Sequence, residues 1–130
     1  MFYTIGEDNI LACWFIKDRK MLSCIKLDYP SCAINISRDS KYLAVGSTNG
    51  TVLIIDPKTL MPTFNFKDRD AEVSCIKFSF DTELLAVGHD APSCDILIYS
   101  IKNHFKKTNV LRGSPARIIS IDFSLNSRIL

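Results

Sequence analysis

The chain has 130 residues, of which 47% are hydrophobic and 23% charged, with a formal net charge of +2. This composition is that of a folded domain and excludes a disordered chain. The near balance of 16 basic and 14 acidic residues lacks the basic excess of nucleic-acid-binding proteins, so we expect no nucleic-acid partner. The longest apolar run, Ile10–Ile16, is too short for a membrane helix and follows no basic segment, so we expect no membrane association.

The five cysteines are scattered along the chain and include no Cys-x-x-Cys pair. Disulfide frameworks and zinc ribbons use clustered, mostly even sets of cysteines. We therefore predict buried reduced thiols and a cytoplasmic location. The five are Cys13, Cys24, Cys32, Cys75 and Cys94.

Alternating apolar residues and recurring turn residues predict about eleven short strands and no helix. Two strands are expected near 2–6 and 11–16, and residues 1–16 form the end of one four-stranded unit. A complete unit is expected over 20–56 and another over 61–100. The start of a further unit is expected over 107–130, including the beginning of a strand at 128–130.

A repeat with a period near 42 residues runs through these units. Asp39 recurs as Asp81 and again as Asn126, each in a polar turn after an apolar strand. Short Asp and Asn side chains stabilise such turns by hydrogen bonding to the nearby backbone. A period of about 40–45 residues is typical of a four-stranded propeller blade.

Glycines mark the ends of matching apolar strands, at Gly6, Gly46 and Gly88. Glycine is the residue that most readily adopts positive φ at such ends. Asn49-Gly50 then predicts a tight type I′ hairpin, in which both residues have positive φ. Together these patterns predict an all-β fold, a β-propeller of four-stranded antiparallel blades with about three blade equivalents in an incomplete ring.

The segment Ser37–Asp56, SRDSKYLAVGSTNGTVLIID, resembles a WD repeat through its Ser-x-Asp turn and its glycine. The Trp-Asp ending of WD repeats is replaced by Ile55-Asp56 and by Tyr99-Ser100, and the expected Gly-His dipeptide is missing. The resemblance therefore implies a WD-type propeller without the buried His–Ser–Trp–Asp hydrogen-bond network. The turn aspartates are expected to act as turn formers only.

Three consecutive segments are together similar to the C-terminal propeller of the echinoderm microtubule-associated protein-like family. They are YLAVGSTNGTVLIIDPKT, then VSCIKFSFDTELLAVGHD followed by ILIYSI, then IISIDFSLNSRIL. The resemblance implies a non-enzymatic protein-interaction scaffold of the cytoplasm and cytoskeleton, with tubulin or microtubules among its partners. The family's hydrophobic propeller-entry motif and coiled coil are missing from these residues, so attachment through them is not implied.

Two other functions are compatible with a WD-type propeller: a generic adaptor in another complex, such as ciliary transport or ubiquitin ligation, and an RNA-binding propeller. The small net charge and the lack of aromatic residues interleaved with basic ones weigh against RNA. We expect no catalytic, cofactor or metal site. His89-Asp90 lies in a turn, where the two side chains do not face each other as general-base catalysis requires. Cys94, His89 and Asp95 do not supply the four ligands of a zinc site.

One basic cluster stands out near the end of the second complete unit. We expect it to contact an acidic protein surface such as tubulin, because charges at the rim of an interface raise association rate and specificity. The alternative is a solvated loop between blades, and the sequence leaves open whether its phenylalanine is buried or exposed as an anchor. The residues are Lys102, His104, Phe105, Lys106 and Lys107.

Three blade equivalents are too few for a propeller, which closes with about 4–8 blades. Unpaired sheet edges promote association with other strands. We therefore expect the chain to be a piece of a longer protein or to self-associate through its unpaired blade edges. In the second case, two copies would form a six-bladed ring in which the end strands of each copy complete those of the other.

Overall fold

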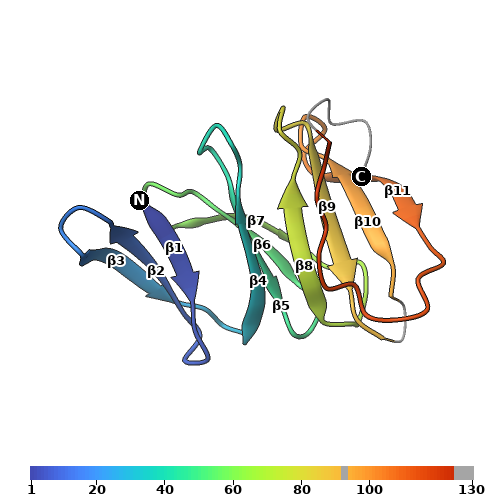
Figure 1. Cartoon of the computed structure of the whole chain (residues 1–130), viewed down its shortest axis with the longest axis horizontal. Helices are drawn as coiled ribbons and strands as arrows, with labels where there is room; N and C mark the ends of the chain where they lie inside the picture. Colours follow the sequence, from blue (N-terminus) through green and yellow to red (C-terminus); the bar gives the residue numbers. More distant parts are fainter. Residues whose placement is uncertain (92–93, 125–130) are drawn as a thin grey trace.

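The computed structural model describes residues 1–91 and 94–124, which form three antiparallel β-sheets and no helix (Figure 1). The described part of the chain therefore contains no helix that could cross a membrane. The sheets stand one after another along the chain, each in strand order, and they do not close into a ring. The first contains β1 (Phe2–Ile5), β2 (Ile10–Phe15) and β3 (Lys20–Lys26). The second contains β4 (Ser31–Ile36), β5 (Leu43–Ser47), β6 (Val52–Ile55) and β7 (Pro62–Phe66). The third contains β8 (Val73–Phe78), β9 (Leu84–His89), β10 (Ile96–Ser100) and β11 (Lys106–Leu111).

The hydrogen-bonded sheets divide the chain differently from the predicted units 20–56 and 61–100. β3 pairs with β2 rather than β4, and β7 pairs with β6 rather than β8. A closed turn joins β6 to β7, in which the Leu60 N–H donates to the Asp56 carbonyl at 2.8 Å. The 67–72 segment instead reaches the next sheet, where its Glu72 carbonyl accepts the Asp90 N–H at 2.9 Å. Each sequence repeat thus ends one sheet and begins the next.

Within the unit predicted over 107–130, the described residues assign only the first strand differently. β11 pairs with β10 and is the outer strand of the β8–β11 sheet. Residues 112–124 form no strand, although Phe123 packs with Ala86 and Ile98 on one face of that sheet. They belong to none of the three sheets, and side-chain packing together with ion pairs of Arg117 to Glu72 and Asp90 holds them. Asn126 and the strand expected at 128–130 lie outside the described residues.

Two matching turns connect the first and second strands of the four-stranded sheets. The Ser37 hydroxyl donates to the Asp39 carboxylate at 2.7 Å, and the Lys41 N–H donates to the same oxygen at 3.0 Å. The bonds recur around Ser79 and Asp81 at 2.6 and 3.0 Å. Burial raises the pKa of Asp39, but these hydrogen bonds outweigh it and hold the pKa below its ordinary value. The repeat is therefore preserved down to individual hydrogen bonds.

The β5–β6 hairpin is a three-residue loop and not the predicted type I′ turn. Gly50 has a φ of +95°, whereas Asn49 does not have positive φ. The Asn49 side chain instead accepts the Thr51 N–H at 3.0 Å and the Ser47 hydroxyl. A single glycine with positive φ after a type I turn is a common hairpin solution. A Cβ at Gly50 would lie 1.9 Å from the Arg69 carbonyl oxygen, so this close approach requires glycine.

Each sheet has one face that carries the matching glycine (Gly6, Gly46 or Gly88) and one face that does not. The β4–β7 and β8–β11 sheets pack through unlike faces, the glycine face of the first against the other face of the second. Ala44 and Ile54, on the face of β4–β7 that carries Gly46, belong to one core cluster with Leu85 and Leu97, on the face of β8–β11 that lacks Gly88. The approach is closest at Gly46, where a Cβ would lie 2.2 Å from Val73 Cγ1. Gly88 repeats this arrangement, since a Cβ there would lie 2.8 Å from Cγ2 of Ile118. The 112–124 segment therefore lies against β8–β11 as β8 lies against β4–β7.

The β1–β3 and β4–β7 sheets pack through like faces. Ile5, directly before Gly6, pairs with Leu11, as Val45, directly before Gly46, pairs with Leu53. These matching pairs meet in one cluster between the two sheets. The opposite face of β1–β3, which carries Gly6, consequently points away from β4–β7 and is exposed. The cluster consists of Leu11, Cys13, Leu27, Leu43, Val45, Ile55 and Leu60, with Tyr3, Ile5, Ile25, Ile34 and Leu53 packed against it.

The prediction that the thiols are buried holds only for some cysteines. All five are free, but Cys24 and Cys32 belong to exposed residues, whereas Cys13 and Cys94 are buried. Cys24 is exposed because it lies on the open face of β1–β3. The Cys32 thiol donates to the Val73 carbonyl at 2.9 Å between two sheets, and burial raises its pKa to about 11.

Candidate partner-binding site

The predicted basic cluster forms the β10–β11 hairpin. Lys102, His104, Lys106 and Lys107 are all exposed on it. The turn is tight, because His104 and Phe105 both have a φ of 59° and the His104 N–H donates to the Ile101 carbonyl at 3.1 Å. Within the described residues no ion pair engages Lys102, Lys106 or Lys107. Three ammonium groups on a defined turn are thus available to an acidic partner.

Phe105 is half-buried and packs between the two four-stranded sheets. Its ring lies 5.7 Å from that of Tyr42, edge to face, and 5.7 Å from that of Phe64. Phe66 lies 6.0 Å from Phe105 and 4.5 Å from Tyr99, so the rings form a continuous aromatic cluster. Aromatic pairs in these geometries stabilise the contact beyond area burial. Phe105 therefore fixes the hairpin and is not a free anchor, whereas Phe64 remains 41% exposed.

A groove of about 380 Å³ runs beside the hairpin, at the end of the sheets that carries the Ser-x-Asp turns. Its lining includes basic side chains, Lys41, Lys102 and His104, and acidic ones, Asp39, Asp81 and Glu83. Charges of both signs therefore meet at this rim. A partner in the groove would meet side chains of both signs, whereas one that approaches β11 would meet Lys106 and Lys107.

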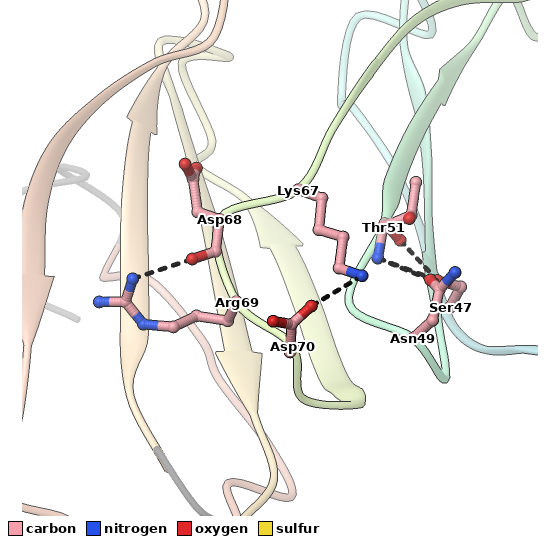
Figure 2. A network of polar contacts seen from close by, with 7 residues as sticks. All are labelled: Ser47, Asn49, Thr51, Lys67, Asp68, Arg69 and Asp70. Carbon is pink, nitrogen blue, oxygen red and sulfur yellow. Dashed lines mark hydrogen bonds and ion pairs between the residues drawn. The ribbon is translucent and has the colours of Figure 1, made fainter.

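A second polar region lies at the opposite end of the sheets, where the 67–72 segment passes the β5–β6 hairpin. Figure 2 shows Lys67 and Asp70 pointing toward each other, and their ion pair measures 2.8 Å. The Arg69 guanidinium turns the other way and donates to the Asp68 carbonyl at 3.0 Å. Ser47, Asn49 and Thr51 form their own closed set of hydrogen bonds beside Lys67.

Further links tie this segment to the β8–β11 sheet. The buried Tyr99 hydroxyl donates to the Asp68 carboxylate at 2.7 Å, and burial raises the pKa of Tyr99 above its ordinary value. Arg69 Nε pairs with Asp95 at 3.3 Å. These two contacts hold the segment that connects β7 to β8 against the β8–β11 sheet. Sequence analysis missed them, although Tyr99 in the Trp position and charged residues in place of Gly-His were the available signals.

His89 is 1% exposed, and its Nδ1 has no hydrogen-bond partner within the described chain. Burial lowers the pKa of His89, so the imidazole is held neutral. The side chain is enclosed beside Arg69 and Asp95 and is not presented at a surface. Among residues 1–91 and 94–124, no group of three His, Cys, Asp or Glu side chains could hold a metal ion.

Comparison with known proteins places the chain within a family. The family described as "Echinoderm microtubule-associated protein second beta-propeller" matches residues 1–130. Echinoderm microtubule-associated protein-like 2 from Mus musculus is 25% identical over 97% of the chain and 20% of its own length. Protein NEDD1 from Mus musculus is 30% identical over 65% of the chain and 13% of its own length. The chain thus spans a fifth or less of these relatives.

The chain is also similar to a protein whose name refers to RNA and to two solved structures. U3 small nucleolar RNA-associated protein 13 from Saccharomyces cerevisiae is 27% identical over 57% of the chain and 9% of its own length. The comparisons therefore do not support the predicted absence of a nucleic-acid partner. Two solved structures, "Structure of U3-55K" and "Crystal structure of RRP9 WD40 repeats", each superpose with a TM-score of 0.79. They are 18% and 19% identical, and each similarity covers 88% of this chain and 36% of the other. The all-β propeller fold is thereby confirmed, and the match over its whole length shows that the chain belongs to the echinoderm microtubule-associated protein family, in the second β-propeller of that family.

Proposed function

We propose that the chain is a non-enzymatic protein-interaction scaffold of the cytoskeleton and that its β10–β11 hairpin contacts the acidic surface of microtubules. Membership of a family named for microtubule association is the observation that carries this proposal. The hairpin supplies the chemistry, because Lys102, Lys106 and Lys107 are exposed and have no ion-pair partner in the described chain. Such charges accelerate association with a surface of opposite sign.

The position of the hairpin supports the same reading. Phe105 ties the turn into the aromatic cluster, so the lysines are presented from a packed base and not from a loose loop. Less conformational entropy is then lost when the lysines meet a partner. A pre-organised charged turn is what recognition of a repeating acidic surface requires.

Microtubule co-sedimentation tests this proposal. We expect saturable pelleting of the chain. Changing Lys102, Lys106 and Lys107 to Glu should lower the affinity for microtubules by about tenfold or more, because three interactions at the rim are lost. The matched control changes Lys17, Arg19 and Lys20 to Glu. This control reverses the same number of exposed charges at the β2–β3 hairpin, which lacks the aromatic base. Equal weakening by both triple variants, or no pelleting of the unchanged chain, would overturn the proposed site.

Single-stranded RNA is a second candidate partner, supported by one feature of the structure. The exposed Phe64 ring is stacked beside Phe105, next to the basic hairpin. Aromatic rings beside basic side chains are the elements with which proteins bind single strands. Adding an unstructured RNA oligonucleotide to the co-sedimentation assay separates the two candidates. If the chain binds RNA more tightly than it binds microtubules, and if Phe64→Ala abolishes the RNA binding, RNA is the better candidate partner. A generic adaptor role remains if neither binds.

A further inference from the structure

A hollow of about 260 Å³ lies at the end of the contact between β1–β3 and β4–β7. The buried side chains of Leu27 and Val45 line it together with the polar side chains of Ser47 and Thr51. Pockets for drug-sized ligands are larger, about 300–1,000 Å³, so the hollow suits one long side chain rather than a whole small molecule. None of its lining residues belongs to the basic β10–β11 hairpin.

The hollow carries a negative charge without a counter-ion. Asp28 is the only residue of its lining that is charged at neutral pH. Within the described chain no ion pair or hydrogen bond engages the Asp28 carboxylate, the Thr51 hydroxyl or the Asn65 amide. These side-chain oxygens are acceptors without a donor. A carboxylate among neutral acceptors favours a cationic ligand, and the planar guanidinium of arginine is the cation that best matches several acceptors at once.

Thr51 and Asp95 hold matching positions in the two four-stranded sheets. The Ser47 N–H donates to the Thr51 carbonyl at 2.9 Å, and the His89 N–H donates to the Asp95 carbonyl at 3.0 Å. Each acceptor directly precedes the third strand of its sheet, β6 or β10. One position of the sheet thus carries a hydroxyl in β4–β7 and a carboxylate in β8–β11.

The segments that lead into β4 and β8 match as well. The Pro30 carbonyl accepts an N–H from the β5–β6 loop at 2.9 Å, and the Glu72 carbonyl accepts one from the β9–β10 loop at 2.9 Å. Three residues before these carbonyls, Leu27 stands in the first segment and Arg69 in the second. Leu27 is therefore the counterpart of Arg69.

In the β8–β11 sheet an arginine of the chain itself fills the matching place. Arg69 Nε pairs with Asp95 at 3.3 Å, and the two side chains are only 23% and 11% exposed. Beside β4–β7 this arginine is replaced by Leu27, and a hollow remains. The next residue, Asp28, supplies a carboxylate to that hollow. The place beside β4–β7 thus keeps an acceptor of negative charge and lacks the cation.

We propose that this hollow binds an arginine side chain from a basic segment of a protein partner, as the matching place of the next sheet binds Arg69. Asp28 is the counter-ion. The Tyr29 ring, which is 49% exposed in the lining, offers a face on which a guanidinium stacks. Leu27 and Leu53 accept the aliphatic part of the side chain. The proposal goes beyond the microtubule site, because it uses a different surface and a partner of opposite charge.

A peptide titration followed by nuclear magnetic resonance tests the proposal. The probe is a Gly-Arg-Gly peptide with blocked ends, added to the isotope-labelled chain. We expect saturable shifts of the Ser47 and Thr51 amide signals, with a Kd on the order of 1 mM for one isolated side chain. The matched control peptide carries citrulline, which has nearly the shape of arginine without its charge, and should leave these signals unchanged.

Two variants test the role of charge in the hollow. Asp28→Asn removes the counter-ion and should weaken peptide binding about fivefold or more, whereas Asp18→Asn, at an exposed carboxylate in the β2–β3 turn, should not. Thr51→Asp places a carboxylate where the next sheet has Asp95 and should strengthen binding about fivefold, a gain that loss of folding cannot produce. No saturable shift with the arginine peptide, equal shifts with the citrulline peptide, or an affinity that neither Asp28→Asn nor Thr51→Asp changes would each overturn the proposal.

Discussion

The two contacts between neighbouring sheets differ in kind. β4–β7 meets β8–β11 through unlike faces, whereas β1–β3 meets β4–β7 through like faces. A contact between unlike faces leaves the complementary face of each sheet free, so the same contact can be repeated around a ring. A contact between like faces buries the same face of both sheets and cannot be repeated in this way. The difference shows that the strand pattern alone does not make a propeller. The glycine at the matching position does not decide which face packs either, since Gly6 lies on the open face of β1–β3 whereas Gly46 lies against Val73.

The largest effect that separates the two contacts is expected at the glycines. Gly46→Ala places a Cβ 2.2 Å from Val73 Cγ1, so the sheets must move apart, at a cost of about 3 kcal/mol. Gly6→Ala at the matching open position should change stability by less than about 0.5 kcal/mol. Urea denaturation of both variants measures the difference. Equal losses would mean that Gly6 is as closely packed as Gly46.

The aromatic side chains should give the next largest difference. Phe105→Ala removes a ring that contacts Tyr42, Phe64 and Phe66 between two sheets, so we expect a loss of about 2 kcal/mol for this half-buried residue. Phe2→Ala on the open face of β1–β3 removes one stacked contact and should cost about half as much or less. Thermal unfolding at fixed pH compares the two, and a larger loss at Phe2 would contradict the assignment of the open face.

Changes in the Ser-x-Asp turns should reduce stability less, and they test whether the two four-stranded sheets depend equally on their turns. Asp39→Ala and Asp81→Ala each remove hydrogen bonds from a Ser hydroxyl and a backbone N–H. We expect similar losses of about 1 kcal/mol in each variant. Denaturation midpoints that differ strongly between the two would show that the turns, despite the same geometry, do not support the sheets equally.

The smallest effect concerns pH and the β8–β11 sheet alone. His89 stands where β5 has Ser47, and burial holds the pKa of His89 below its ordinary value of about 6.5. The unfolded chain then binds the proton more readily than the folded chain, so stability falls as the pH drops below about 6.5. His89→Ser should reduce this loss between neutral and mildly acidic pH. Unchanged pH dependence in the variant would assign the loss to other groups.

Much of the fold could be predicted because it is written in local patterns. Alternating apolar residues predicted most strands, and the repeat from Asp39 to Asp81 predicted matching turns and the propeller. The grouping of strands into sheets could not be predicted in this way. Whether β7 pairs with β6 or β8 depends on the closed turn after β6 and on contacts such as the one between Gly50 and Arg69, which lie apart in sequence.

The candidate site divides in the same way. The basic residues of the β10–β11 hairpin are visible in the sequence, since they are neighbours there. The packing of Phe105 was undecided, because it depends on Phe64 and Phe66, about forty residues earlier in the chain. The like-face contact of β1–β3 was missed altogether. Its signal is that Tyr3 and Ile5 are larger and more apolar than Thr4 and Gly6, so the more apolar face is the one that becomes buried.

The offset between sequence repeat and sheet has a consequence for how such chains can change in length. Because each repeat ends one sheet and begins the next, a duplicated segment of about 42 residues inserts a whole sheet and leaves no strand without a partner at either junction. Loss of one segment removes a whole sheet just as cleanly. Genes encoding this architecture can therefore gain or lose repeats by unequal recombination at almost any point within the period, while the folded product keeps complete strand pairing.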